Sequence, residues 1–239
     1  MENAKVMSTP LATHFKLSSR HSPSNEVEKT NMSLVLYAYV VDSLMYVMMC
    51  TRPDIAHAVG TKALECCEKI LRYFHGTSGL RLCFGGDKPT LVGYSNSYMV
   101  GDIDSRKSTL DYLIKFARGA MAWQFKLQKC VALFTTEVEF IHYRSMQEVA
   151  LGEEILAGAW FCSRQILSAI HFGKNSTFHS RSKHIDVRYH WIGDILDAKL
   201  LKLAKIHTDD NGADMMTKVL PRGNFEACFE IPGLTITST

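Results

Sequence analysis

Cysteine and histidine side chains are the first candidates for chemistry in this 239-residue chain. Its seven cysteines include the adjacent pair Cys66-Cys67, which could bind a soft metal ion, but none are spaced as Cys-x-x-Cys. Two buried helix residues are the better interpretation of that pair. His179, His184 and His190 follow one another at spacings of five and six, which places them on different faces of a helix. A shared zinc site is therefore not expected.

Acidic and basic side chains are the second group of candidates. Glu139 lies in a stretch with helical character, and most acidic residues on helices only face solvent. Asp214 lies in the first turn of a short predicted helix, where its charge complements the helix dipole without implying any chemistry. Two basic groups could contact phosphates, although small basic runs more often form solvated surface: Arg106-Lys107, and Lys126 with Lys129.

The element around which the chain is organised is a predicted strand that begins at Thr90. Apolar and β-prone residues follow Thr90, and the polar residues 95–97 then end the strand. This places the short side chain of Asn96 at the mouth of the strand. Two further strands complete an antiparallel meander, at 112–116 and 121–123.

Helical patterns dominate before residue 87, and mixed patterns follow it. Beyond the meander the chain is expected to form, in order, a helix from 135 to about 155, a further strand, an amphipathic helix at 183–197, a strand at 200–207 and a short helix that contains Asp214. This order predicts an α/β fold in which residues 90–220 form a mixed sheet of about five strands flanked by helices.

These patterns divide the chain into four parts. They are a linker or arm (1–30), a small mostly helical segment (31–87), the mixed α/β domain (88–221) and a tail (222–239). A chain of 239 residues is long enough to bury one good core, with or without a smaller appendage.

Composition and charge exclude several classes of protein. Hydrophobic residues make up 46% of the chain and charged residues 21%, which argues against wholesale disorder. The net charge of +3 is too small to indicate nucleic-acid binding by itself.

The apolar run Leu34–Cys50 is shorter than the roughly 20 residues of a membrane span and contains Asp42, so a buried helix is predicted. Cysteine usage and the lack of a signal-peptide pattern indicate a reduced, intracellular protein.

Five short motifs are distributed along nearly the whole chain: Thr51–Ile55, Ser105–Thr109, Thr135–Glu139, Lys183–His190 and Thr208–Asp214. In sequence and in order they resemble the Pol polyprotein of copia-type retrotransposons. The resemblance covers the end of the reverse transcriptase, followed by the RNase H domain. The paired-aspartate motif of the polymerase has no counterpart, since Val41-Asp42-Ser43 does not match it.

The resemblance implies an RNase H-like fold and its chemistry. Such domains hold two Mg²⁺ ions about 3.5–4 Å apart on a cluster of carboxylates, and these ions activate water and stabilise the leaving oxygen. Carried over by position, two of the four carboxylates are Glu139 and Asp214, but Asn96 and Gln165 stand where the family has aspartates. Amide side chains keep an oxygen and lose the charge, so Mg²⁺ binding is expected to be weak or lost.

Two classes of function follow from the resemblance. In the first, the chain is an active or residually active nuclease that cuts the RNA strand of an RNA–DNA hybrid. In the second, it is a catalytically dead remnant that at most binds nucleic acid or a protein partner. Asn96 and Gln165 favour the second, and Arg106 and Lys107 are the expected contacts to nucleic acid. We further expect the site positions to meet at one end of the sheet: Asn96, Glu139 and Asp214, with Gln165 nearby.

Overall fold

The structure is a computed structural model that describes residues 4–11, 25–27, 30, 37–60, 64–86, 90–99, 101–102, 104–133, 137–138, 159–163 and 201–236. Of two predicted helices, one lies almost entirely outside these residues and the other lies wholly outside them. The helix expected at 135–155 is described only at 137–138, and the one expected at 183–197 is not described.

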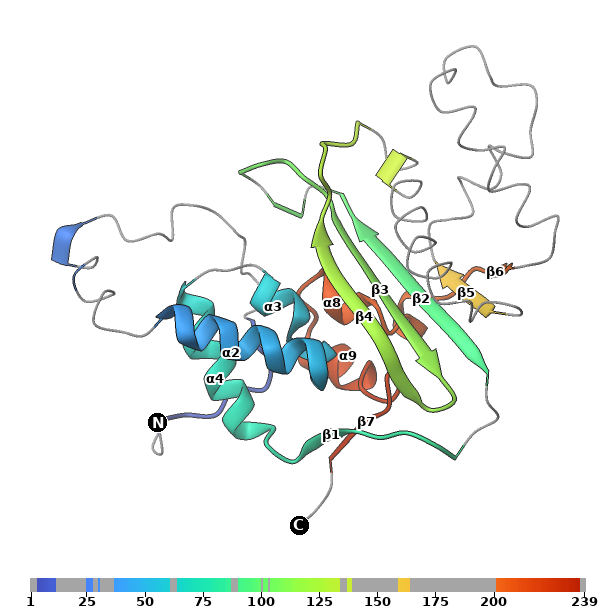
Figure 1. Ribbon diagram of the computed structural model, residues 1–239, viewed down its shortest axis with the longest axis horizontal. Helices are drawn as coiled ribbons and strands as arrows, with labels where there is room; N and C mark the ends of the chain where they lie inside the picture. Colours follow the sequence, from blue (N-terminus) through green and yellow to red (C-terminus); the bar gives the residue numbers. More distant parts are fainter. Residues whose placement is uncertain are drawn as a thin grey trace.

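A mixed sheet forms the centre of the fold (Figure 1). Its strands are β2 (Leu91–Tyr98), β3 (Thr109–Phe116), β4 (Gly119–Leu127), β5 (Ala159–Ser163) and β6 (Leu201–Ala204). Their spatial order is β4-β3-β2-β5-β6, in which β4, β3 and β2 are antiparallel neighbours and β5 and β6 run parallel to β2. The predicted α/β class, with a mixed sheet of five strands, is therefore confirmed for the described part of the chain.

The β2 strand is longer than its sequence indicates. The polar residues 95–97 do not end it, because the ladder with β3 continues through the pair Tyr98–Thr109. Asn96 therefore lies inside the strand and faces Asp111 directly across the ladder. Its polar neighbours Ser95 and Ser97 are buried at this end of the strand, which packs against a short helix that also carries buried polar side chains.

The helical segment lies beside the antiparallel strands (Figure 1). Its elements are α2 (Tyr37–Cys50), η2 (Pro53–Ile55), α3 (Ala56–Gly60) and α4 (Leu64–Gly76). α3 contacts β4, and the later helix α8 (Asp214–Thr217) contacts both β2 and β3. One hydrophobic core joins these parts and includes buried side chains from each of them: Ile55, Val59, Tyr73, Leu113, Met215 and Met216.

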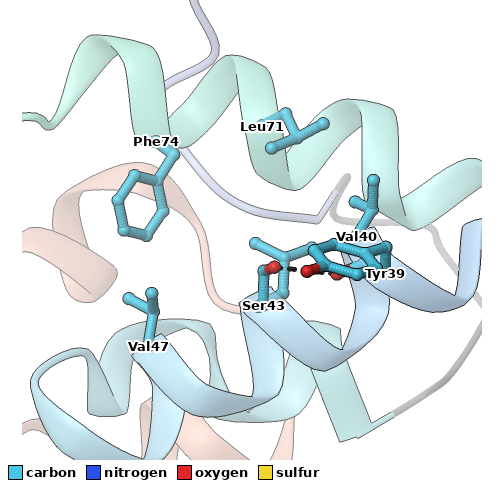
Figure 2. A pocket seen from close by; sticks show the side chains of 7 residues that line it. Tyr39, Val40, Ser43, Val47, Leu71 and Phe74 are labelled. Carbon is cyan, nitrogen blue, oxygen red and sulfur yellow. Dashed lines mark hydrogen bonds between the residues drawn. The ribbon is translucent and has the colours of Figure 1, made fainter. Parts of the chain in front are cut away.

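The α2 helix is only partly buried, whereas the sequence predicted a buried helix. Leu44 is 5% exposed, whereas Tyr39, Tyr46 and Met49 are 67–74% exposed. An apolar cavity of about 370 Å³ opens between α2 and α4, with Leu71 and Phe74 on the α4 side (Figure 2). The described residues that line it are apolar, apart from the hydroxyl groups of Tyr39 and Ser43. Within the described part of the chain, no helix combines the length and apolarity needed to cross a bilayer.

The C-terminal residues do not form the tail that was predicted. They form α9 (Arg222–Ala227) and β7 (Leu234–Ile236), and β7 pairs with β1 (Leu80–Leu82) in an antiparallel ladder. Phe225 is 3% exposed, and its ring packs edge-on against Tyr73 and Phe229. Phe225, Cys228 and Phe229 are spaced as on one face of a helix, and this spacing brings the three side chains to the buried side.

Gly233 lets the chain turn into β7, and replacing it by alanine is expected to lower the free energy of unfolding by about 1–3 kcal/mol. Its φ is +81°, and a Cβ there would lie 2.6 Å from the carbonyl oxygen of Arg118 and 2.8 Å from that of Cys83. The Gly233 carbonyl also accepts a hydrogen bond from the Cys83 N–H. Urea unfolding followed by circular dichroism measures the change.

Gly223 is the matched control for this substitution. It lies in α9, and a Cβ there would meet no atom within 4 Å. Alanine at an open helical position is expected to be neutral or stabilising by up to about 1 kcal/mol. Equal responses of Gly233→Ala and Gly223→Ala would contradict the role assigned to Gly233.

Candidate active site

Three polar side chains converge where β2, β3 and α8 meet. Asn96 of β2 and Asp111 of β3 are directly opposite in an antiparallel ladder, so their side chains share one face of the sheet. Asp214 begins α8, which packs against both strands. All three are buried, with exposed fractions of 8% for Asn96, 1% for Asp111 and 2% for Asp214.

The Asn96 amide is fully engaged by its neighbours. Its Nδ2 donates to Asp214 Oδ1 at 2.5 Å and to Thr217 Oγ1 at 2.8 Å, while its Oδ1 accepts the Ser97 backbone N–H at 3.0 Å. These hydrogen bonds determine the orientation of the Asn96 amide, whose nitrogen faces the Asp214 carboxylate. An aspartate at this position would instead bring two anions together, and only a cation between them would stabilise that arrangement.

The second carboxyl oxygen of Asp214 forms an ion pair with a lysine. Lys218 Nζ lies 2.6 Å from Asp214 Oδ2, and the Lys218 side chain is 29% exposed. The pair spans one turn of helix, and its lysine is the more exposed partner. The Asp214 charge is therefore already offset by the Lys218 ammonium and by the Asn96 amide.

Asn211 fixes the position of α8 relative to β2. Its Oδ1 accepts the Ala213 backbone N–H at 3.2 Å, and its Nδ2 donates to the Ser95 carbonyl at 3.1 Å. Asn211 is fully buried. Asn211 therefore both caps the start of the helix and ties its first turn to the strand that carries Asn96.

Asp111 is a site residue that the sequence analysis missed. Among the described residues, no side chain forms a hydrogen bond with either of its carboxyl oxygens. Burial raises the pKa of Asp111 well above its ordinary value, and the nearby charge of Asp214 raises it further. The Asn96 backbone and Lys218 act in the opposite direction. The available signal was an acidic residue inside the otherwise apolar stretch Leu110–Ile114.

The structure places some predicted site residues and leaves others undescribed. It brings Asn96 and Asp214 into contact although 118 positions separate them. Glu139 and Gln165 lie outside the described residues, as do the three histidines considered for zinc.

Arg106 and Lys107 lie in the loop that joins β2 to β3, at the Asn96 end of these strands. The Asp102 carboxylate organises the loop by accepting hydrogen bonds from Ser105 Oγ at 2.5 Å and from the Asp104 N–H at 3.1 Å. Arg106 is exposed and Lys107 is half-buried.

The described residues do not fit a pair of Mg²⁺ ions. Two closely spaced divalent ions need several carboxylates, and only Asp111 and Asp214 meet here. Within the described ranges, no group of three or more acidic, histidine or cysteine side chains could hold a metal ion. Asn96 directs a nitrogen to the place where a metal ligand would need an oxygen.

Comparisons with known proteins identify the origin of the chain. No family model matches it. It is 49% identical over 255 residues to "Retrovirus-related Pol polyprotein from transposon TNT 1-94" of Nicotiana tabacum, in an alignment that covers 98% of this chain. The chain belongs to the copia-type retrotransposon Pol family. A second relative, the Pol polyprotein from transposon RE1 of Arabidopsis thaliana, is 30% identical over 253 residues and 95% of this chain.

This Pol chain corresponds to only part of those polyproteins. It spans 19% of the tobacco relative and 16% of the Arabidopsis relative. Among solved structures it resembles LC11-RNase H1 in complex with an RNA/DNA hybrid, with a TM-score of 0.40 and 10% identity, over 53% of this chain and 93% of that one. The chain is thus similar to a part of copia-type Pol polyproteins.

Proposed function

We propose that this Pol fragment descends from a nuclease that cut the RNA strand of RNA–DNA hybrids, and that it no longer hydrolyses RNA. The observation that carries the proposal is the state of Asp214. Its two carboxyl oxygens contact the Asn96 amide and the Lys218 ammonium, so side chains of the protein itself offset its charge.

Electrostatics explains why this arrangement opposes two-metal hydrolysis. Mg²⁺ gives up its water reluctantly, and anionic ligands offset that cost. Glu139 is proposed as a third former ligand and Gln165 as the second position that has lost its charge. With aspartate replaced at 96 and 165, the remaining negative charge no longer holds two divalent ions close together. Removing one neutral donor from a preorganised site already costs about 10²–10³ in rate.

Binding of nucleic acid without catalysis is the second candidate function. Arg106 and Lys107 favour it because they lie in the β2–β3 loop, at the Asn96 end of β2 and β3. Cationic side chains there are proposed to contact backbone phosphates of a hybrid, which position a duplex without reading its sequence. The segment at 31–87 is proposed to be the remnant of the reverse transcriptase end.

The purified chain is expected to show no measurable cleavage of the RNA strand in an RNA–DNA hybrid with Mg²⁺. A gel assay with labelled RNA measures this, and a mobility shift of the uncut hybrid measures binding separately. The restoration variant is Asn96→Asp with Gln165→Asp, because it returns both lost charges to the site. Any gain of cleavage in this variant should disappear when Glu139→Gln is added.

Matched folding controls make the assay decisive. Circular dichroism of each variant excludes unfolding as the cause of inactivity. Robust cleavage by the unmodified chain, abolished by Glu139→Gln, would show that the site is still active and would overturn the proposal. A hybrid shift that Arg106→Ala with Lys107→Ala removes would support the binding function.

A further inference from the structure

The outward face of α2 is apolar, which is unusual for a helix that meets solvent. Tyr39, Tyr46 and Met49 are 74%, 71% and 67% exposed. Asp42 is the only charged residue among the 14 residues of α2. Helices at a protein surface normally carry charged side chains on the outward face, and contiguous exposed apolar surface marks a contact with another molecule. A partner with an apolar surface of its own is therefore expected on this face.

Four side chains on the outward face of α2 have the spacing of a helix that pairs with another helix. Tyr39, Ser43, Tyr46 and Cys50 follow one another at intervals of four, three and four residues, and all four are exposed. Such intervals keep one row of side chains directed at a partner helix. Large and small side chains alternate along the row. When a second copy of the row runs in the opposite direction, each tyrosine meets a small residue: Tyr46 meets Ser43, and Tyr39 meets Cys50.

The cavity between α2 and α4 lies beside the same row (Figure 2). Tyr39 and Ser43 line it from α2, and Leu71 and Phe74 line it from α4. The Ser43 hydroxyl already donates a hydrogen bond to the Tyr39 carbonyl at 2.8 Å, so the wall makes little polar demand on an occupant. Cavities of about 300 Å³ or more hold small organic molecules, so a volume of about 370 Å³ accommodates a tyrosine ring.

We propose that two copies of the chain associate through α2, with the two helices antiparallel about a two-fold axis. In this dimer the Tyr46 ring of each copy enters the cavity of the other copy beside Ser43. A two-fold interface uses the same surface on both partners, so that surface must be complementary to itself. The α2 face meets this condition because it carries both the projecting rings and the places that receive them.

The apolar area indicates how strong such a dimer is. An aromatic side chain buries about 150–250 Å², so the exposed parts of Tyr39, Tyr46 and Met49 supply on the order of 400 Å² per copy. A standard specific interface buries about 800 Å² per partner, and weak, transient ones bury less. The dimer is therefore expected to be reversible and weak. It goes beyond the proposed function, because it requires neither RNA cleavage nor a bound nucleic acid.

Sedimentation velocity of the full chain at concentrations of about 1–100 μM tests the proposal in the range expected for a weak interface. The parent is expected to change from monomer to dimer with rising concentration. Tyr46→Lys is expected to weaken the dimer at least tenfold, because it would bury a charge in an apolar cavity. The matched control is Ile236→Lys, which adds the same charge at a 73% exposed apolar residue of β7 and should leave the dimer unchanged.

Mixing two variants tests the antiparallel pairing itself. Ser43→Glu and Tyr46→Lys are each expected to be monomeric alone and to form a heterodimer when mixed, because the new carboxylate of one chain then meets the new ammonium of the other. A parent chain that stays monomeric at every concentration, or dimerisation of Tyr46→Lys equal to that of the parent, would overturn the proposal. Association that continues beyond the dimer would exclude a closed two-fold interface, and failure of the mixed variants to associate would exclude the antiparallel pairing.

Discussion

Replacing Asp54 by asparagine is expected to lower the free energy of unfolding by about 3–5 kcal/mol. The Asp54 carboxylate is fully buried and receives two hydrogen bonds from Arg52, from Nε to Oδ1 at 2.8 Å and from Nη2 to Oδ2 at 2.7 Å. The Tyr73 hydroxyl donates to Oδ2 at 2.6 Å. Asparagine would leave the Arg52 guanidinium, which is 3% exposed, in the core without its counter-ion.

The rest of the Arg52 environment cannot replace that counter-ion. Nη1 and Nη2 donate to the backbone and hydroxyl oxygens of Thr77 at 3.2 and 2.8 Å, and the guanidinium lies 4.5 Å from the centre of the Phe74 ring. These groups are neutral. Burial disfavours the charged guanidinium, yet Asp54 keeps the pKa of Arg52 above its ordinary value.

Urea unfolding at neutral pH measures the effect, and an exposed ion pair provides the control. Arg222 and Glu226 form an ion pair of 2.8 Å with side chains that are 68% and 48% exposed. Glu226→Gln is expected to cost no more than about 0.5 kcal/mol. The double variant Arg52→Met with Asp54→Leu should lose less stability than Asp54→Asn, since it leaves no buried charge. Equal losses for Asp54→Asn and Glu226→Gln would contradict this account.

The sequence predicted those parts of the fold that local patterns determine. β-Prone residues identified β2, β3 and β4, and helical patterns before residue 87 identified the early helices. The contact between Asn96 and Asp214 could be expected only through the resemblance to Pol proteins. No local pattern in either segment indicates that a strand and a helix so far apart in the chain will meet.

The missed features depend on long-range packing. The role of Asp111 requires the β2–β3 register, which puts it opposite Asn96, and a single acidic residue in a strand does not reveal what lies across from it. Likewise, β7 is three residues long and becomes a strand only because β1 supplies its partner. The buried pairing of Arg52 with Asp54 is also tertiary, because Tyr73 and Thr77 of a later segment complete it.

Acid is expected to destabilise the protein through His57. This side chain in α3 is half-buried and packs against Phe125, with 5.5 Å between the ring centres. Burial lowers the pKa of His57 to about 4, although a hydrogen bond with the Lys218 backbone acts in the opposite direction. A histidine whose pKa is lower in the folded state binds a proton more readily after unfolding. Its contribution is therefore complete above the ordinary pKa of about 6.5 and is lost as the pH falls towards 4.

His57→Gln isolates this effect, because glutamine keeps a donor and does not titrate. Between its pKa values in the folded and unfolded states, one such group changes the free energy of unfolding by about 1.4 kcal/mol per pH unit. Since the ring keeps some contact with solvent, the parent chain should lose at most about 3 kcal/mol more than His57→Gln between pH 6.5 and pH 4. Urea unfolding at several pH values gives the free energy of unfolding of the parent and of His57→Gln as a function of pH. The difference between these two curves removes the contribution of all other titrating groups.

The control is His75→Gln, which changes an exposed histidine at the end of α4 and should retain the acid-sensitive slope of the parent. Parallel stability curves for the parent and His57→Gln would show that His57 is protonated as easily in the folded chain as in the unfolded one.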